Sequence, residues 1–243
     1  MAMDPDDDTE RMLADAQLSL DERLALAWAR ASDRAALTAV RSIWHEVGGI
    51  PGRCSDPQVA RTRLEWWQRE LERLHHGQAQ HPATRVLQAD GRAGVMLELG
   101  DDLIVAVRAE IQPGGTADLA ALMAHLRRRH AGYFEGLGQV LGIPVGTAVL
   151  DCYAAARGGQ RLLAGDPAML GCLPRRPTMS VDQRREDTLN ELGNIMIVNN
   201  NKLSGLGSFL GATLALAVAE GRGEDLGAFR RLWRAWSAAR RAS

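Results

Sequence analysis

Histidine and cysteine, the residue types that most often bind metals or act as nucleophiles, are sparse in this sequence and poorly spaced for a shared site. The 243-residue chain has six histidines and three cysteines. His125 and His130 are five residues apart, off the i, i+4 spacing that places two metal ligands on one helix face. The cysteines Cys54, Cys152 and Cys172 form no Cys-x-x-Cys pair. We therefore expect neither a zinc site nor a disulfide framework.

A polar stripe in the segment EDTLNELGNIMIVNN is better suited to catalysis than the histidines and cysteines are. Asp187, Glu191 and Asn194 stand at positions i, i+4 and i+7, so they share one face of a helix. An amide in such a stripe can position a water molecule without needing a shifted pKa. The pattern resembles the active-site signature of the chemotaxis response-regulator phosphatases, which implies a phosphatase-like role for Glu191 and Asn194. The alternatives are a solvated polar face and a displaced metal site.

The composition is that of an ordinary globular protein, with 46% hydrophobic and 24% charged residues. No apolar run reaches the roughly 18 residues that could span a bilayer. The 29 basic and 30 acidic residues nearly cancel, so a general attraction to nucleic acid is not indicated. The first ten residues include four aspartates and lack the apolar region of a secretory signal. We expect a folded, cytoplasmic protein.

The elements that would position these residues are helices. Ala, Leu and Arg dominate, and aromatic residues make up only 5% of the chain. We predict an all-α fold, with residues 1–18 as an acidic, poorly ordered segment and residues 19–243 as one helical domain. The segment 95–111 could form two short strands, but its pattern favours a helix. Capping residues and apolar periodicity predict the other helices. One helix starts at the capping box formed by Ser19 and Glu22, and another at 116–141 has Thr116 as its N-cap. The remaining helices are predicted at 56–76, 145–163, 180–197, 212–220 and 226–241.

The segment at 55–87, SDPQVARTRLEWWQRELERLHHGQAQHPATRVL, resembles the second conserved block of the squalene/phytoene synthase family. That block has an Asp-Pro pair, an Ala-Arg pair, a double Trp followed by Glu, and a Gly-x-x-x-His-Pro ending. The matching positions are Asp56, Pro57, Ala60, Arg61, Leu64, Trp66, Trp67, Glu70, Leu71, Gly77, His81 and Pro82. Weaker similarity continues over most of the chain.

This resemblance implies a single-domain helical bundle of the terpenoid (isoprenoid) synthase type. It also implies a substrate-binding role for part of the block, namely Arg63, Trp66, Trp67, Glu70 and His81. Trp66 and Trp67 point about 100° apart on a helix, so only one of them can face the core. The other is expected to cover a groove or a neighbouring helix, or to line a prenyl pocket.

Active members of that family hold magnesium and two diphosphates with Asp-x-x-x-Asp pairs on two facing helices. Where the first pair is expected, this sequence reads AVRSIWHEVGGIPGRCSDP, with Glu46 as the only carboxylate before Asp56. In the helix that resembles the second pair, Asp151 and Asp166 are fifteen positions apart. Since Mg²⁺ requires several oxygen ligands in near-octahedral geometry, scattered carboxylates such as Glu46 and Asp151 are poor candidates. We expect no metal and no cofactor, with Mg²⁺ as the alternative.

These departures favour a non-catalytic relative whose helical cup binds an isoprenoid, another lipid or a protein partner. Buried methylene groups can hold such a chain, and the Arg-rich segments at 127–129 and 157–161 could contact an anionic headgroup. The alternatives are an active prenyl-diphosphate transferase with atypical acidic ligands and the phosphatase-like use of Glu191 and Asn194. The C-terminal segment RRLWRAWSAARR could lie on an anionic membrane surface, or pack with its arginine stems over apolar surface.

Overall fold

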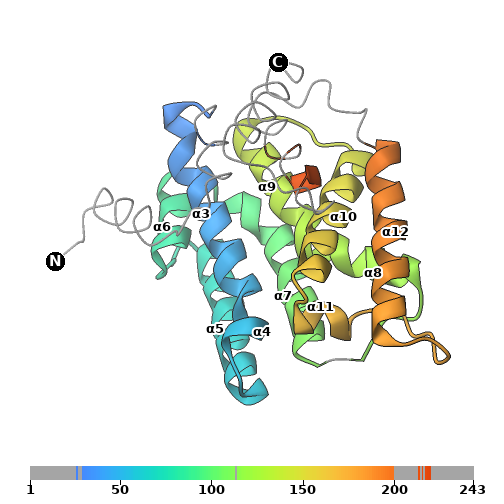
Figure 1. The fold of residues 1–243 in the computed structure, drawn as a ribbon. Coiled ribbons are helices and arrows are strands. Elements are labelled where there is room, and N and C mark those ends of the chain that lie inside the picture. The colour runs from blue at the N-terminus through green and yellow to red at the C-terminus, as the bar shows by residue number, and fades with distance from the viewer. Residues whose placement is uncertain are drawn as a thin grey trace.

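The computed structural model describes residues 26, 29–112, 114–199, 213, 215 and 217–219. Within these ranges the regular structure is helical, and no β-strand is formed beyond one isolated bridge between Thr116 and Pro174. Helices α3 to α6 lie together on one side, α7, α9 and α10 pass through the middle, and α12 covers the opposite side (Figure 1). This arrangement confirms the predicted all-α bundle. The Ser19 capping box, the acidic segment at 1–18 and the helix expected at 226–241 lie outside the described residues.

Four helices form the side of the bundle that carries the double tryptophan: α3 (Ala31–Gly48), α4 (Ile50–Arg53), α5 (Pro57–His75) and α6 (Pro82–Ala89). The side chain of Asp56 accepts a hydrogen bond from the Gln58 amide at 2.7 Å and caps α5. Pro57 occupies the first position of that helix, where a missing N–H has no cost. The predicted helix at 56–76 is therefore confirmed, with the expected start.

The middle of the bundle begins with a short 3-10 helix, η1 (Ala93–Met96), followed by α7 (Leu97–Ile111). The predicted helix at 95–111 is thus confirmed over its main length, and the alternative of two strands is wrong. Leu103, Val107 and Glu110 follow one another at i, i+4 and i+7 on α7, and all three are buried. The apolar stripe therefore ends in a buried carboxylate, which bears on the site described below.

The helix predicted at 116–141 is interrupted and begins later than expected. It consists of α8 (Leu119–Leu126), a π-helical segment η2 (Arg127–Ala131) and α9 (Gly132–Leu141). The N-cap is Asp118, whose carboxylate accepts from the Ala121 amide at 2.8 Å, so the prediction of Thr116 as N-cap is wrong. The Thr116 hydroxyl instead donates to the carbonyl of Cys172 at 2.9 Å. The Thr116 side chain therefore bonds to the loop that contains Cys172 and does not cap the helix.

The rest of the bundle comprises α10 (Thr147–Leu163), α11 (Pro167–Gly171) and α12 (Val181–Asn199), with α12 packed along α10. The Trp44 indole of α3 donates to the Arg129 carbonyl at 3.1 Å and supplies a partner within the π-helical segment. Among the described residues, no helix is both long enough and apolar enough to cross a membrane.

The packing of α10 against the end of α8 depends on Gly158 of α10. A Cβ atom added there would lie 2.7 Å from the Cδ1 atom of Leu126, which is fully buried at the end of α8. By contrast, Gly52 of α4 is exposed and has nothing within 4 Å of an added Cβ. The two glycines therefore differ in packing alone, since both are helical.

We predict opposite effects for alanine at these two positions. Gly158→Ala should lower the free energy of unfolding by about 1 to 3 kcal/mol, because the added methyl group overpacks the core. Gly52→Ala should raise it by about 0.5 kcal/mol through its better helix propensity. Urea unfolding of both variants measures the difference, and equal effects would contradict the close packing of α10 on α8.

Candidate functional site

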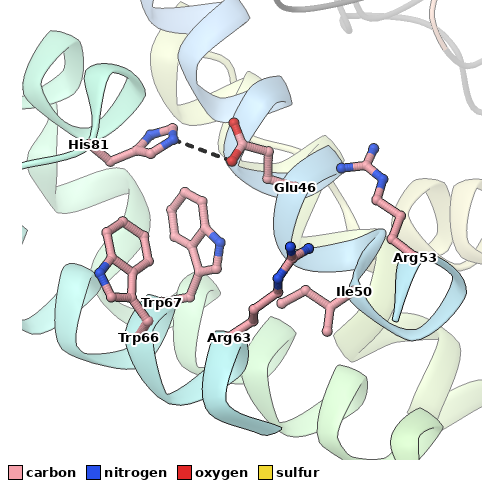
Figure 2. A pocket seen from close by; sticks show the side chains of 7 residues that line it. All are labelled: Glu46, Ile50, Arg53, Arg63, Trp66, Trp67 and His81. Atoms are coloured by element: carbon pink, nitrogen blue, oxygen red, sulfur yellow. Dashed lines mark ion pairs between the residues drawn. The ribbon is translucent and has the colours of Figure 1, made fainter. Parts of the chain in front are cut away.

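Four of the five candidate substrate-binding residues of the conserved block line a hollow of about 300 Å³ between α3, α4 and α5. We call it the tryptophan hollow. Figure 2 shows the side chains around it, with both tryptophans on one side and the two arginines near α4 and the start of α5. Its lining consists of Glu46, Ile50, Arg53, Arg63, Trp66, Trp67 and His81. Five of these residues were predicted from the sequence, whereas Ile50 and Arg53 were not.

The two tryptophans have the two environments that the helical pattern predicts. Trp67 is buried with 5% of its surface exposed, whereas Trp66 is 39% exposed. Their rings are edge to face with centroids 5.3 Å apart, and the guanidinium of Arg73 lies 5.6 Å from the Trp66 ring. Trp67 also contacts the His81 ring at 4.7 Å between centroids. Buried and exposed aromatic surfaces therefore meet at the wall of the hollow.

Glu70 lies beneath the wall and holds the loop that carries His81. Its fully buried carboxylate accepts hydrogen bonds from the amides of Gln80 and His81, both at 2.8 Å, and from the hydroxyl of Thr84. Arg73 completes the set with an ion pair at 2.7 Å. Burial alone would raise the pKa of Glu70, but these hydrogen bonds outweigh it and lower the pKa. Glu70 is thus a positioning residue behind the hollow and does not line it.

Some of the charged side chains that line the hollow have partners in the chain, and one does not among the described residues. Glu46 lies 3.3 Å from the Nε2 atom of His81, and Arg53 contacts the ring of His45. Arg63 has no hydrogen bond or ion pair with any part of the chain that the structure describes, and its side chain is exposed. The hollow therefore offers one cation that has no partner among the described residues, beside two aromatic rings.

A second constellation, which we call the Glu110 cluster, lies inside the bundle and was missed by the sequence analysis. The carboxylate of Glu110 on α7 pairs with Arg161 of α10 at 2.5 and 3.0 Å and with Arg129 of η2 at 3.2 Å. His125 of α8 lies 3.2 Å from the same oxygen. Arg161 also pairs with Asp166 at 2.7 Å. The only signal in the sequence is that Glu110 continues the apolar stripe of Leu103 and Val107.

The cluster reaches the end of α3 through one arginine. An Nη atom of Arg129 donates to the carbonyl oxygen of Gly48 at 2.6 Å. A Cβ atom at Gly48 would lie 2.5 Å from this guanidinium, so the glycine makes room for it. One arginine and one glutamate therefore join α3, α7, η2 and α10.

The protonation states of the cluster follow from burial and from neighbouring charges. Burial would raise the pKa of Glu110, but the hydrogen bond from His125 and the charges of Arg129 and Arg161 lower it well below its usual range. Burial lowers the pKa of His130, which lies beside the cluster, and the charges of Arg129, Arg161, Arg157 and His125 lower it further. His130 is therefore neutral at pH 7 and Glu110 is ionised.

The predicted acidic ligands are engaged in separate ion pairs. Glu46 pairs with His81, and Asp151 accepts two hydrogen bonds from Arg127, one of them at 2.9 Å. Among the described residues, no three His, Cys, Asp or Glu side chains are arranged to hold a metal ion. Contact of the arginines at 127–129 and 157–161 with an anionic headgroup stays a prediction, but Arg127, Arg129 and Arg161 are already engaged. Each of these is paired with a carboxylate of the chain.

The polar stripe on α12 faces a cation. Arg176 pairs with Asp187 at 2.9 Å and with Glu191 at 3.2 Å, while Asn194 is exposed one turn further along. The side chains of Asp187 and Glu191 thus share one face, as the spacing predicts. The phosphatase-like role of Glu191 and Asn194 stays a prediction.

Comparison with known proteins finds one matching family and several similar solved structures. The family model for squalene/phytoene synthase matches residues 21–163. The crystal structure of squalene synthase HpnC from Alicyclobacillus acidocaldarius is similar with a TM-score of 0.66 and 16% identity, covering 100% of this chain and 98% of that one. A dehydrosqualene synthase in complex with ligand is similar with a TM-score of 0.71 and 12% identity, covering 97% and 98%. No curated protein sequence matches significantly.

We predict that the Glu110 cluster is a major contributor to stability. Glu110→Gln should lower the free energy of unfolding by about 3 to 5 kcal/mol, because it leaves the buried Arg129 guanidinium without its carboxylate and removes one of the two carboxylates that pair with Arg161. Asp102→Asn on the same helix is the control, since Asp102 is 59% exposed and lies 3.8 Å from Arg128. It should change stability by less than about 0.5 kcal/mol. Urea unfolding that gives equal losses for the two variants would contradict the role of the cluster.

We also predict a loss of stability in mild acid that originates at His130. Its lowered pKa in the folded state means that the unfolded chain binds the proton more readily, so folding is favoured above the ordinary histidine pKa of about 6.5. Between pH 7.5 and 5.5 this effect lowers the free energy of unfolding by about 1 kcal/mol. His130→Gln should lose that much less over the same range. Identical pH slopes in the two proteins would contradict the prediction.

Proposed function

The chain belongs to the squalene/phytoene synthase family, and we propose that it is a non-catalytic member that binds an isoprenoid or another lipid without transferring a prenyl group. In this proposal the helical bundle is retained as a binding scaffold. Active members of the family hold magnesium and two diphosphates inside the bundle. In this chain the described residues bring the charges of the Glu110 cluster together there.

The observation that supports the proposal most strongly is the hydrogen bond that the Arg129 guanidinium donates to the carbonyl oxygen of Gly48. In active members, the corresponding part of the sequence carries paired aspartates, whereas here α3 ends with glycine and an arginine occupies the adjoining space. Arg161 brings a second guanidinium from α10, the helix that resembles the second acidic motif. Guanidinium groups at this junction repel a divalent cation and hold the helices together without one.

The residues that are present do not fit magnesium. Mg²⁺ takes oxygen ligands in near-octahedral geometry and needs carboxylates with free oxygens. Glu110 and Asp166 each accept from the Arg161 guanidinium, and Asp151 accepts from Arg127. Glu46 belongs to the tryptophan hollow and pairs with His81. Because each of these carboxylates already has a basic partner from the chain, we derive no catalytic step through the metal.

Binding of a chain-like apolar ligand does not require that metal. Each buried methylene group contributes about 0.8 kcal/mol, so a prenyl or acyl chain can be held by apolar contacts alone. Without a magnesium bridge to a diphosphate, the affinity for such a ligand should not depend on the metal. An amphipathic segment of a protein partner would satisfy the same apolar contacts.

The proposal is tested by incubating the purified protein with farnesyl diphosphate, with and without Mg²⁺. We expect no release of pyrophosphate, and a calorimetric affinity that is the same within about twofold in the two conditions, since no metal bridges the ligand. The squalene synthase HpnC named above serves as the positive control for the assay. Magnesium-dependent release of pyrophosphate would show an active transferase with atypical ligands and would overturn the proposal.

A further inference from the structure

We propose that the tryptophan hollow is a binding site for a small, flat, apolar monoanion, with an aryl carboxylate as the fitting class of ligand. The site shares no residue with the Glu110 cluster, so it goes beyond the lipid-binding role proposed above and does not depend on it. Three features of the hollow support this inference: its charge, its aromatic wall and its size.

The charge of the lining fits a single negative charge. Arg53 and Arg63 bring two positive charges, and Glu46 brings one negative charge that is held by His81. Counting the two arginines and Glu46 alone, the balance is one positive charge, which suits a carboxylate better than a diphosphate. Arg63 is the natural anchor, because it has no partner among the described residues and its planar guanidinium can bind both oxygens of a carboxylate.

The aromatic wall fits a flat apolar body. Trp66 exposes 39% of its surface, and Trp67 and His81 stand beside it with ring centroids 5.3 and 6.1 Å from its own. Ile50, which is 3% exposed, adds an aliphatic contact from the start of α4. Figure 2 shows the rings and the Arg63 guanidinium around one hollow, so a ring against the tryptophans can place its carboxylate near Arg63.

The wall is preorganised before any ligand binds. Glu70 accepts hydrogen bonds from the backbone amides of Gln80 and His81, and Trp67 is packed into the core. A rigid wall reduces the entropy lost on binding. The hollow of about 300 Å³ is at the lower end of the range for small-molecule sites, so it suits a compact ligand of one or two fused rings.

The test is a titration of the full chain with 2-naphthoate, followed by calorimetry. We expect saturable binding, and an affinity at least about 10-fold weaker for 2-naphthamide, which has the same rings without the charge. Inorganic phosphate, which has the charge without the rings, should bind at least about 10-fold more weakly than 2-naphthoate. Equal affinity for either comparison compound would overturn the assignment of a flat monoanion, as would the absence of saturable binding of 2-naphthoate.

Variants locate the binding in the hollow. Arg63→Gln and Trp66→Leu should each weaken the binding of 2-naphthoate about 10-fold, because one removes the anchor and the other the exposed ring. Arg69→Gln is the matched control, since Arg69 is an exposed arginine of α5 that pairs with Glu65 at 3.9 Å and does not line the hollow. It should leave the affinity within about twofold. Wild-type affinity in Arg63→Gln would refute the site.

The two proposals fail separately. About 10-fold weaker naphthoate binding in Arg63→Gln, together with no release of pyrophosphate from farnesyl diphosphate by the wild-type chain, is the result expected if both hold. Release of pyrophosphate from farnesyl diphosphate would refute the non-catalytic role and leave the hollow standing. An absence of naphthoate binding would refute the hollow and leave the non-catalytic role standing.

Discussion

The pairing of one buried carboxylate with two guanidinium groups is the interaction on which the interior of this protein depends. Glu110 is fully buried at its side chain, and it pairs with Arg161 and Arg129 from two other elements. Arg129 extends the contact to the Gly48 carbonyl at the end of α3. Each charge in this arrangement would be unfavourable without the others, because burial penalises isolated ions strongly. The helices that meet at the cluster therefore have to be positioned together.

This pairing has a consequence for function as well as for packing. A site that binds magnesium and diphosphate needs carboxylates with free oxygens, and such a site can be emptied without unfolding the protein. In the Glu110 cluster the cations belong to the chain itself, so they cannot dissociate. In the proposed non-catalytic role, the scaffold keeps its helical arrangement without the metal chemistry of the family, which agrees with the rule that fold does not imply function.

The tryptophan hollow differs from the Glu110 cluster, because its polar groups are accessible from outside the bundle. Glu70 is buried and satisfied, and its hydrogen bonds fix the loop before His81. Arg63 and the exposed part of Trp66 remain available for a ligand. The ionic groups of the Glu110 cluster pair with one another inside the bundle. At the hollow, by contrast, Arg63 has no partner among the described residues.

Local signals explain why some features could be predicted from the sequence. Asp56 and Pro57 form a helix start whose effect is confined to adjacent residues, and the helical spacing predicted that only one tryptophan of the pair is buried. The hollow was partly predictable because most of its residues belong to one continuous block.

Pairings across long sequence separations could not be predicted in the same way. Arg161 is 51 residues from Glu110, and Arg129 is 81 residues from Gly48. No local rule relates such residues, so the arginines of η2 and α10 were expected to be available when they are paired. The wrong N-cap at Thr116 has the same origin, since its hydroxyl bonds to the Cys172 carbonyl 56 residues away.

Thermal unfolding with Mg²⁺ and a non-hydrolysable farnesyl diphosphate analogue tests the central claim most directly, because a ligand that binds the folded state raises the melting temperature. The measurement compares the analogue alone with the analogue plus Mg²⁺. If guanidinium groups of the chain stand in place of a metal site, adding Mg²⁺ should leave the melting temperature unchanged within about 1 °C. A rise of many degrees that requires both Mg²⁺ and the analogue would contradict the account.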